Sequence, residues 1–153
     1  MRRVLTRALP CAMTETEAAF RFSHLLTVAD EDIDELGHAN NVQYLRWVQD
    51  VAGAHWRAIV PAEALGRYIW VVREHHIRYL QSAVAGDVLR ATTWVGEMRG
   101  AQCQRFTRLE READSVLLSE AETQWVLLDP QSRRPVRVGE EVAGWLVRTT
   151  TSG

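Results

Sequence analysis

The sequence of 153 residues has little cysteine, no long apolar run and no excess of positive charge. Its two cysteines, Cys11 and Cys103, are too few for a secreted disulfide framework and lack metal-ligand spacing, so we expect free thiols in a reducing, cytoplasmic compartment. No stretch approaches the roughly 20 apolar residues of a membrane-spanning helix, and we expect no membrane partner. The formal net charge of −2 supplies no overall positive field, which argues against nucleic acid as a partner.

Several motifs of metal and nucleophile chemistry are also missing. No HExxH, CxxC or GxSxG occurs, so zinc hydrolysis and a serine-type triad have no support. Asp30, Asp32 and Asp34 have the spacing of the first ligands of a calcium loop. However, Glu35 stands where that loop needs glycine, and Asn41 stands where it needs a bidentate glutamate. We therefore expect no metal and no separate cofactor.

The chain has the composition of one globular domain, with 46% hydrophobic and 25% charged residues. We place this domain at residues 19–147. Residues 1–18 have the basic start of a signal peptide, but Arg7 and Pro10 interrupt the apolar stretch that such a peptide needs. We therefore predict a disordered extension over residues 1–18 and a flexible tail over residues 148–153.

The hydrophobic period changes along the domain. Residues 20–29 alternate apolar and polar side chains, which predicts a half-buried strand, with His24 as a hydrogen-bonded interior histidine. Residues 40–59 have helical period and only a narrow polar face, so this helix needs a cover larger than one neighbouring helix. A second, short helix is predicted near residues 139–146.

Four more strands are predicted over residues 69–80, 87–98, 101–112 and 115–128, which are rich in Val, Thr, Trp and Tyr and separated by short turns. We expect these four strands to form a meander, with the adjacent His75 and His76 on opposite faces. Small side chains such as Thr93 and Ala121 would let the sheet close tightly around the helix. The predicted class is α+β, with one sheet wrapped around one helix.

The stretch DIDELGHANNVQY (32–44), followed by Trp47, resembles the DxDxxGHxNNxxY signature of the hot-dog-fold acyl thioesterases, a group that includes 4-hydroxybenzoyl-CoA thioesterase and plant acyl-ACP thioesterases. The resemblance continues through REHHIRYLQSAVAGDVLRATTWV and WVLLDPQSRRPVRVGEEV, and spans about residues 20–143. It implies a hot-dog fold, in which an antiparallel five-stranded sheet wraps around one long central helix. It also implies hydrolysis of an acyl or aroyl thioester of coenzyme A or acyl carrier protein to the free acid and thiol, by a homodimer or homotetramer.

The same resemblance implies the catalytic positions. Asp34 falls where the family carries its catalytic carboxylate, which acts as a general base or as a nucleophile; capping of its own loop is the structural alternative. His38 aligns with a histidine that plant members use near the reaction centre, or it orders the loop. Asn41 occupies the position whose backbone N–H bacterial members direct toward the thioester carbonyl. Leu36 replaces an asparagine of the plant enzymes, so their full constellation is absent.

The predicted substrate-binding residues are Gly37, Asn40, Tyr44, Trp47 and Glu74. Asn40 stands at a helix N-cap position, where free N–H groups and the positive end of the helix dipole can hold a developing oxyanion. Gly37 allows a positive φ in the turn. Tyr44 and Trp47 line an acyl pocket or pack in the core, and Glu74 would be a second polar group near the site.

Two other functions stay open. One is a hot-dog hydratase or dehydratase acting on acyl-CoA. The spacing from Asp34 to His38 counts against it, because it does not match the DxNPxH pattern typical of such enzymes. The other is a non-catalytic sensor that binds acyl-CoA. Thiol release from acyl-CoA separates a thioesterase from both.

Overall fold

The computed structural model describes residues 21–147, so the predictions for residues 1–18 and 148–153 lie outside the described residues. In chain order the elements are β1 (Phe22–Thr27), the 3-10 helix η2 (Asp30–Asp32), α2 (Asn41–Ile59), the 3-10 helix η3 (Ala62–Arg67), β2 (Ile69–Tyr79), β3 (Val88–Arg99), β4 (Gln102–Arg111), β5 (Leu117–Leu128) and α3 (Glu140–Val147). The predicted long helix, the predicted strands and the predicted short helix are all confirmed, with small differences at their ends.

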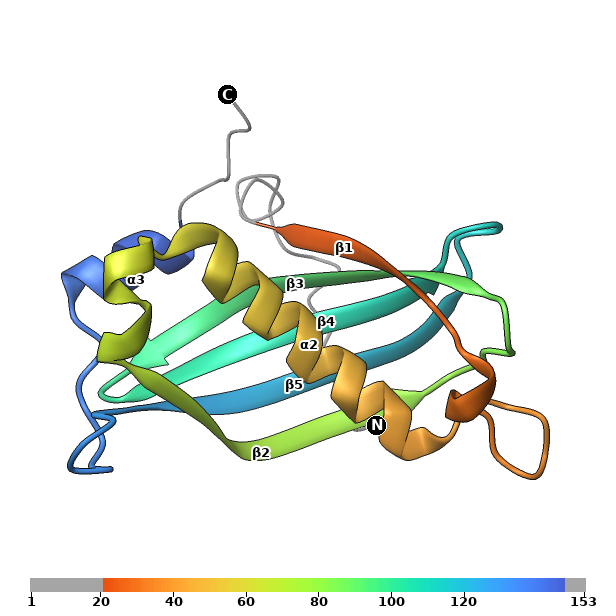
Figure 1. Ribbon diagram of the computed structural model, residues 1–153, viewed down its shortest axis with the longest axis horizontal. Helices are drawn as coiled ribbons and strands as arrows, with labels where there is room; N and C mark the ends of the chain where they lie inside the picture. Colours follow the sequence, from red (N-terminus) through yellow and green to blue (C-terminus); the bar gives the residue numbers. More distant parts are fainter. Residues whose placement is uncertain (1–20, 148–153) are drawn as a thin grey trace, which may run out of the picture.

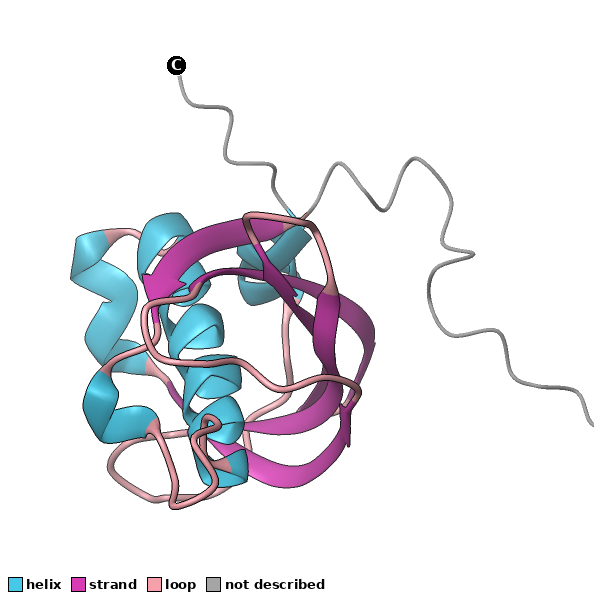
Figure 2. Ribbon diagram, turned by 90° about the vertical axis from the view of Figure 1, so that its right-hand side faces the viewer, coloured by secondary structure: helices cyan, strands magenta, loops and turns pink. Residues whose placement is uncertain are grey.

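All strands belong to one antiparallel five-stranded sheet in the order β1-β3-β4-β5-β2. The sheet curves around α2, which crosses its concave face (Figures 1 and 2). β3, β4 and β5 form a meander, but β2 pairs with β5 and lies at the edge opposite β1. The predicted four-strand meander is therefore wrong at β2. The residue types in a segment indicate that it forms a strand, but they do not indicate which strand lies next to it. The position of β2 in the sheet depends on the edge at which it can cover the side of α2 remote from β1.

The helix α2 packs on the sheet through one face. Its buried side chains recur at helical spacing and are Tyr44, Trp47, Val48, Val51, Ala52 and His55. On the other face Arg46, Asp50 and Arg57 are exposed, so the sheet covers the helix on one side only. Pro61 follows the helix end at Ile59, and the residue before a proline is disfavoured in helical conformation.

The inner face of the sheet carries small buried side chains, as predicted. Ala91, Thr93, Ser119, Ala121 and Thr123 are all at most 7% exposed. Such short side chains let the helix approach the sheet closely, which allows a single sheet to form the core with a single long helix.

The structure confirms the prediction for His75 and His76 and contradicts part of the prediction for His24. His75 faces α2 and its Nδ1 lies 2.8 Å from Thr123 Oγ1, while the side chain of His76 is 72% exposed, so the prediction of opposite faces is confirmed. The prediction for His24 is wrong in one respect. Its Nε2 is buried but has no hydrogen-bond partner among the described residues, and burial lowers its pKa. Its ring instead packs edge-on against Phe22.

Of the helices in residues 21–147, none combines the length and the apolar character that spanning a membrane requires.

Candidate functional site

The polar segment between β1 and α2 folds into a compact loop. An isolated antiparallel bridge joins Ile33 to Ala39, and the Asp34 N–H donates to the His38 carbonyl oxygen at 2.8 Å. The Gly37 N–H donates to the Asp34 carbonyl oxygen at 3.1 Å, which closes a tight turn. Gly37 has φ +80°, as predicted, because a side chain is strained in that conformation. The loop thereby holds Asp34 opposite His38, which lies three residues before α2 begins.

Asp34 has one oxygen committed to the loop and one oxygen free. Its Oδ1 accepts hydrogen bonds from the backbone N–H groups of Leu36 (2.9 Å) and His38 (3.3 Å). The capping role that the sequence offered as the structural alternative is therefore present. No residue between 21 and 147 donates to Oδ2. The loop orients the carboxylate without using both of its oxygens.

The start of α2 offers an unused backbone donor. Asn40 is the N-cap, as predicted, and its side-chain oxygen accepts from the Val42 N–H at 3.1 Å. The Gln43 N–H donates to the Asn40 carbonyl oxygen at 2.8 Å. The Asn41 N–H has no acceptor within the described part of the chain. Because it lies at the positive end of a 19-residue helix, this N–H is suited to binding an oxyanion.

A residue that sequence reasoning missed also fixes the first turn of α2. The Tyr79 hydroxyl, at the end of β2, donates to the carbonyl oxygen of Asn41 at 3.1 Å. The ring of Tyr79 also makes an edge contact with the ring of Tyr44. Only the pairing of β2 with β5 brings this strand end beside the helix start, so no local signal in the sequence could have identified Tyr79.

Tyr44 and Trp47 are core residues, only 2% and 4% exposed. The Tyr44 hydroxyl accepts a hydrogen bond from the Ala83 N–H at 2.9 Å, and the Ala83 carbonyl oxygen accepts from the Ala39 N–H at 2.9 Å. Of the two roles that the sequence left open, the structure shows packing. Neither ring lines the large cavity described below.

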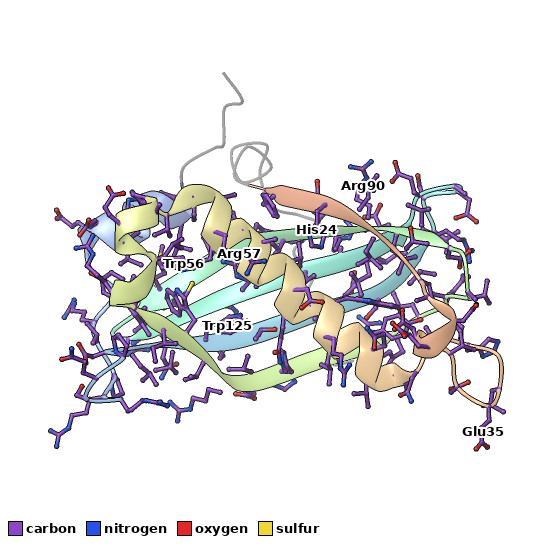
Figure 3. The ribbon with its side chains drawn as sticks, in the orientation of Figure 1. His24, Glu35, Trp56, Arg57, Arg90 and Trp125 are labelled. Atoms are coloured by element: carbon purple, nitrogen blue, oxygen red, sulfur yellow. The ribbon has the colours of Figure 1, made fainter. Side chains whose placement is uncertain are left out.

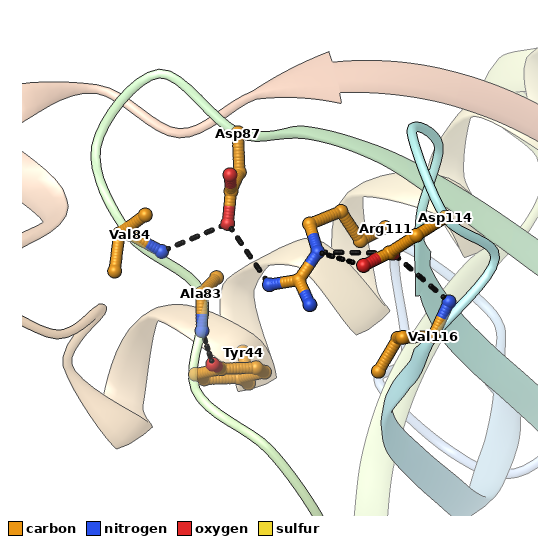
Figure 4. A network of polar contacts seen from close by, with 7 residues as sticks. All are labelled: Tyr44, Ala83, Val84, Asp87, Arg111, Asp114 and Val116. Carbon is orange, nitrogen blue, oxygen red and sulfur yellow. Dashed lines mark hydrogen bonds and ion pairs between the residues drawn. The ribbon is translucent and has the colours of Figure 1, made fainter.

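The turn after Ala83 belongs to a polar network that braces the helix start (Figure 4). The Asp87 carboxylate accepts from the Val84 N–H at 3.0 Å and lies 3.6 Å from the Arg111 guanidinium. Arg111 also pairs with Asp114 at 3.0 Å. The Gly86-Asp87 turn, part of the family resemblance, therefore has a structural role. It fixes the segment in which Ala83 bonds to Ala39 and Tyr44, next to the start of α2.

The side chains of His38 and Glu74 form no hydrogen bond with Asp34 or Asn41 in the described chain. The side chain of His38 is exposed, and its predicted catalytic role stays a prediction. Glu74 lies on the face of the sheet opposite α2, where it pairs with His76 at 2.6 Å. A bulge after Val72 shifts the register of β2 before Glu74, and the predicted place of Glu74 as a second polar group near the site stays a prediction.

A cavity of about 390 Å³ lies between the second half of α2, η3 and the inner face of the sheet. Its lining includes Trp56, Arg57, Trp70, Cys103, Arg105 and Trp125. Figure 3 shows Trp56 and Trp125 in this region, with Arg57 on the helix above. No local pattern in the sequence indicates this cavity, because its lining residues come from five separate segments.

Two groups near the cavity have strongly shifted pKa values. Burial and the neighbouring Arg105 lower the pKa of His55 to about 3, so its ring is neutral at ordinary pH. Burial raises the pKa of the Cys103 thiol to about 11, which makes it a poor nucleophile. Within residues 21–147, no group of three or more His, Cys, Asp or Glu side chains is arranged to hold a metal ion.

Comparison with known proteins places the chain in a family. The model of the thioesterase-like superfamily matches residues 28–146. A search of curated proteins finds no similar sequence. Among solved structures, 1,4-dihydroxy-2-naphthoyl-CoA thioesterase from Synechocystis is similar with a TM-score of 0.72 and 15% identity, over 82% of this chain and 95% of that chain.

Two further structures have the same architecture. The protein SAV2348 from Staphylococcus aureus, in complex with CoA, has a TM-score of 0.71 and 25% identity over 82% of this chain and 80% of that chain. A mutant of 4-hydroxybenzoyl CoA thioesterase, complexed with 4-hydroxybenzoyl CoA, has a TM-score of 0.75 and 15% identity over 82% of this chain and 98% of that chain. Because the family match covers nearly the whole described domain, the chain belongs to the thioesterase-like superfamily and has the hot-dog fold.

Proposed function

We propose that this protein is an acyl-CoA thioesterase, which hydrolyses an acyl or aroyl thioester to the free acid and the thiol. The observation that carries the proposal is the Asp34 carboxylate, which its own loop orients through Oδ1 in the segment directly before α2, whose first N–H, that of Asn41, has no acceptor in the described chain. Membership of the thioesterase-like superfamily supports the reaction class. The CoA complex of SAV2348 supports coenzyme A as the thiol portion.

The chemistry needs a base or nucleophile and a place for negative charge. When the thioester carbonyl is attacked, charge moves onto its oxygen, and the Asn41 N–H at the helix start is a preorganised donor for that charge. The free Oδ2 of Asp34 either accepts a proton from the attacking water, after which the C–S bond breaks and the thiol leaves, or itself attacks the carbonyl carbon, which expels the thiolate and forms a mixed anhydride that water then opens. Both routes use the same oxygen and release the same two products.

The assembly that we propose is a homodimer formed through β2, or a homotetramer built from two such dimers. β2 is an eleven-residue edge strand that pairs only with β5 in the described chain, so its other edge presents unpaired backbone groups. Apolar side chains near the helix start and the end of β2 are also exposed, among them Leu36 (81%), Val42 (59%) and Leu80 (42%). Apolar side chains gathered at one end of a domain favour contact with another protein surface.

The test of the function is thiol release from a panel of acyl- and aroyl-CoAs. We expect turnover on at least one substrate, and a loss of about a hundredfold or more in Asp34→Asn. The amide oxygen of asparagine can still accept from the Leu36 and His38 N–H groups, so the loop should keep its shape. Asp50→Asn, an exposed change on the polar face of α2, is the matched control and should keep activity.

Three other results of this experiment would contradict the proposed function. Full activity in Asp34→Asn would show that the carboxylate does not act in the reaction. Binding of acyl-CoA without thiol release from any substrate would identify a sensor. Addition of water to an enoyl-CoA without thiol release would identify a hydratase.

A further inference from the structure

Arg105 is a buried cation without a counter-ion. Its side chain comes from β4 and the residue is only 5% exposed. No carboxylate between residues 21 and 147 forms an ion pair with it. Burial lowers its pKa to about 10, which leaves the guanidinium charged at neutral pH. A buried charge is unfavourable unless it is paired, so a bound anion would stabilise this site.

Two neutral side chains fix the direction of this guanidinium. Nη1 of Arg105 donates to Thr93 Oγ1 at 3.1 Å and to His55 Nδ1 at 3.0 Å. The other two guanidinium nitrogens, Nε and Nη2, have no acceptor in the described chain. Neither of them is fully enclosed by protein, in contrast to Trp125 Nε1, which is buried and has no acceptor among the described residues. A ligand can therefore reach the free nitrogens of Arg105.

The two free nitrogens form the edge of the guanidinium that binds a carboxylate with two parallel hydrogen bonds. Arg90 makes this contact elsewhere in the domain, where its Nε and Nη2 donate to the two carboxylate oxygens of Glu112 at 2.9 and 2.6 Å. Arg105 has the same pair of nitrogens but no carboxylate beside them. Because arginine can only donate, the complementary ligand must bring acceptor oxygens.

The surroundings of Arg105 favour an anion with a hydrocarbon part. Arg105 lines the 390 Å³ cavity between α2, η3 and the sheet. The lining contains no Asp or Glu, and Arg57 adds a second positive charge. The other lining residues are mainly aromatic or aliphatic, with Trp56 and Trp70 in edge contact. Apolar walls with a few polar groups are typical of sites for small organic molecules.

The cavity lies away from the helix start of the same chain. Gln49, the first cavity residue along α2, follows Asn41 by roughly 12 Å. His55, the partner of Arg105, follows Asn41 by roughly 21 Å along the same helix. Neither Asp34 nor Asn41 is among the lining residues. The occupant that fits is therefore a separate molecule and not the acyl group of a thioester bound at the helix start.

We propose that this cavity is a second binding site, which takes a free monocarboxylic acid with a hydrocarbon body, and that Nε and Nη2 of Arg105 pair with its carboxylate. The aromatic and aliphatic walls enclose the hydrocarbon part. The proposal adds a site to the protein and does not depend on the proposed thioesterase function, because no bond is made or broken in this cavity.

The cavity volume limits the size of the ligand. A volume of 390 Å³ equals roughly a dozen water-sized volumes of about 30 Å³ each, which sets an upper bound on the number of non-hydrogen atoms. 3-Phenylpropanoate lies within this bound, and its ring suits walls that contain Trp56 and Trp70. 3-Phenylpropanamide has nearly the same shape without the charge, so the two compounds isolate the contribution of the carboxylate.

The experiment is calorimetric titration of the full chain with each of these two compounds. We expect 3-phenylpropanoate to bind the wild-type protein, and Arg105→Met to weaken this binding by about tenfold or more, because charged hydrogen bonds are lost. Arg105→Lys keeps the charge but cannot form the two-pronged contact, so its affinity should be intermediate. The amide should bind the wild-type protein about tenfold more weakly than the acid. No binding of the acid, or equal binding of acid and amide, would overturn the proposal.

Gly53 offers a test that leaves Arg105 in place. It lines the cavity from α2, and a Cβ there would come nearest to the flexible end of the Arg57 side chain, at 3.1 Å. Gly53→Leu should fill part of the cavity and weaken binding of the acid, while the higher helix propensity of leucine preserves the fold. Gly144→Leu is the matched control in α3, where no atom lies within 4 Å of the new Cβ, and it should keep the wild-type affinity. Wild-type affinity in Gly53→Leu would overturn the proposal.

Asp34→Asn separates the two sites of the protein. This variant should bind 3-phenylpropanoate as tightly as the wild-type protein, because Asp34 does not line the cavity. Loss of binding in Asp34→Asn, with binding retained in Arg105→Met, would place the acid at the helix start and overturn the proposal. If the protein hydrolyses no thioester but binds the acid through Arg105, the proposed function fails and the second site stands.

Discussion

The guanidinium of Arg105 donates to Nδ1 of His55 across 3.0 Å in the interior of the domain. The contact joins β4 to α2 and requires His55 Nδ1 to carry no proton, because a charged donor needs an acceptor with a free lone pair. The cation in turn lowers the pKa of the histidine, in addition to the larger effect of burial.

The His55 contact predicts acid sensitivity. The pKa of His55 is about 3 in the folded state and near 6.5 in the unfolded state, so between these values the unfolded chain binds a proton that the folded chain does not. Stability is unaffected above pH 6.5 and falls as the pH is lowered through this window, by up to about 1.4 kcal/mol per pH unit. Urea unfolding at several pH values should show a shallower acid slope in His55→Gln, whose side-chain oxygen can still accept from Arg105.

His76→Gln is the control for that experiment, because the side chain of His76 is 72% exposed, and it should keep the wild-type slope. An acid slope in His55→Gln as steep as that of the wild-type protein would show that His55 does not stay neutral in the fold.

The N-cap of α2 should contribute measurably to stability. Asn40→Ala removes the oxygen that accepts from the Val42 N–H and should cost about 1 kcal/mol of unfolding free energy. Calorimetry should show a fall in Tm of roughly 2–4 °C for a domain of this size. Asn40→Asp keeps an acceptor at the same position and should restore most of the loss. An unchanged Tm in Asn40→Ala would show that the cap adds nothing.

Gly37 and Gly66 form a matched pair of glycines. Neither has an atom within 4 Å of the place where a Cβ would lie, but only Gly37 has a positive φ, of +80°. Gly37→Ala should therefore destabilise the fold by about 1–2 kcal/mol through backbone strain alone. It should also reduce thioesterase activity, because the turn positions Asp34. Gly66→Ala should change the unfolding free energy by less than about 0.5 kcal/mol. Equal effects would refute the strain argument.

Cys103 should be inert in the native protein. It is 2% exposed and burial raises its pKa from 9.0 to about 11, so thiolate is scarce at pH 8. In Cys11→Ser, where Cys103 is the remaining cysteine, modification by a disulfide reagent should be about a hundredfold slower in buffer than in denaturant. Fast labelling of the native variant would mean that the cavity wall around Cys103 opens readily.

The sequence alone determined the elements and the local chemistry of the helix start. The 3.6-residue period over residues 40–59, the Asn40 cap and the turn at Gly37 all depend on contacts between residues a few positions apart, and such contacts leave a pattern in the chain. For the same reason the sequence also indicated that Asp34 could cap its own loop. The family resemblance added the fold name, because the strand and helix order agreed with it.

Only the tertiary structure decided the side-by-side order of the strands and the environment of Arg105. β2 pairs with β5 and brings Tyr79 to the helix start, and neither fact has a local signal. The segment QCQRFTRLER places arginines on both faces of β4, so nothing in it separates the buried Arg105 from the more exposed Arg108. Whether a strand arginine faces a carboxylate, water or a cavity depends on which distant segments pack against it, and that is settled only when the sheet closes around α2.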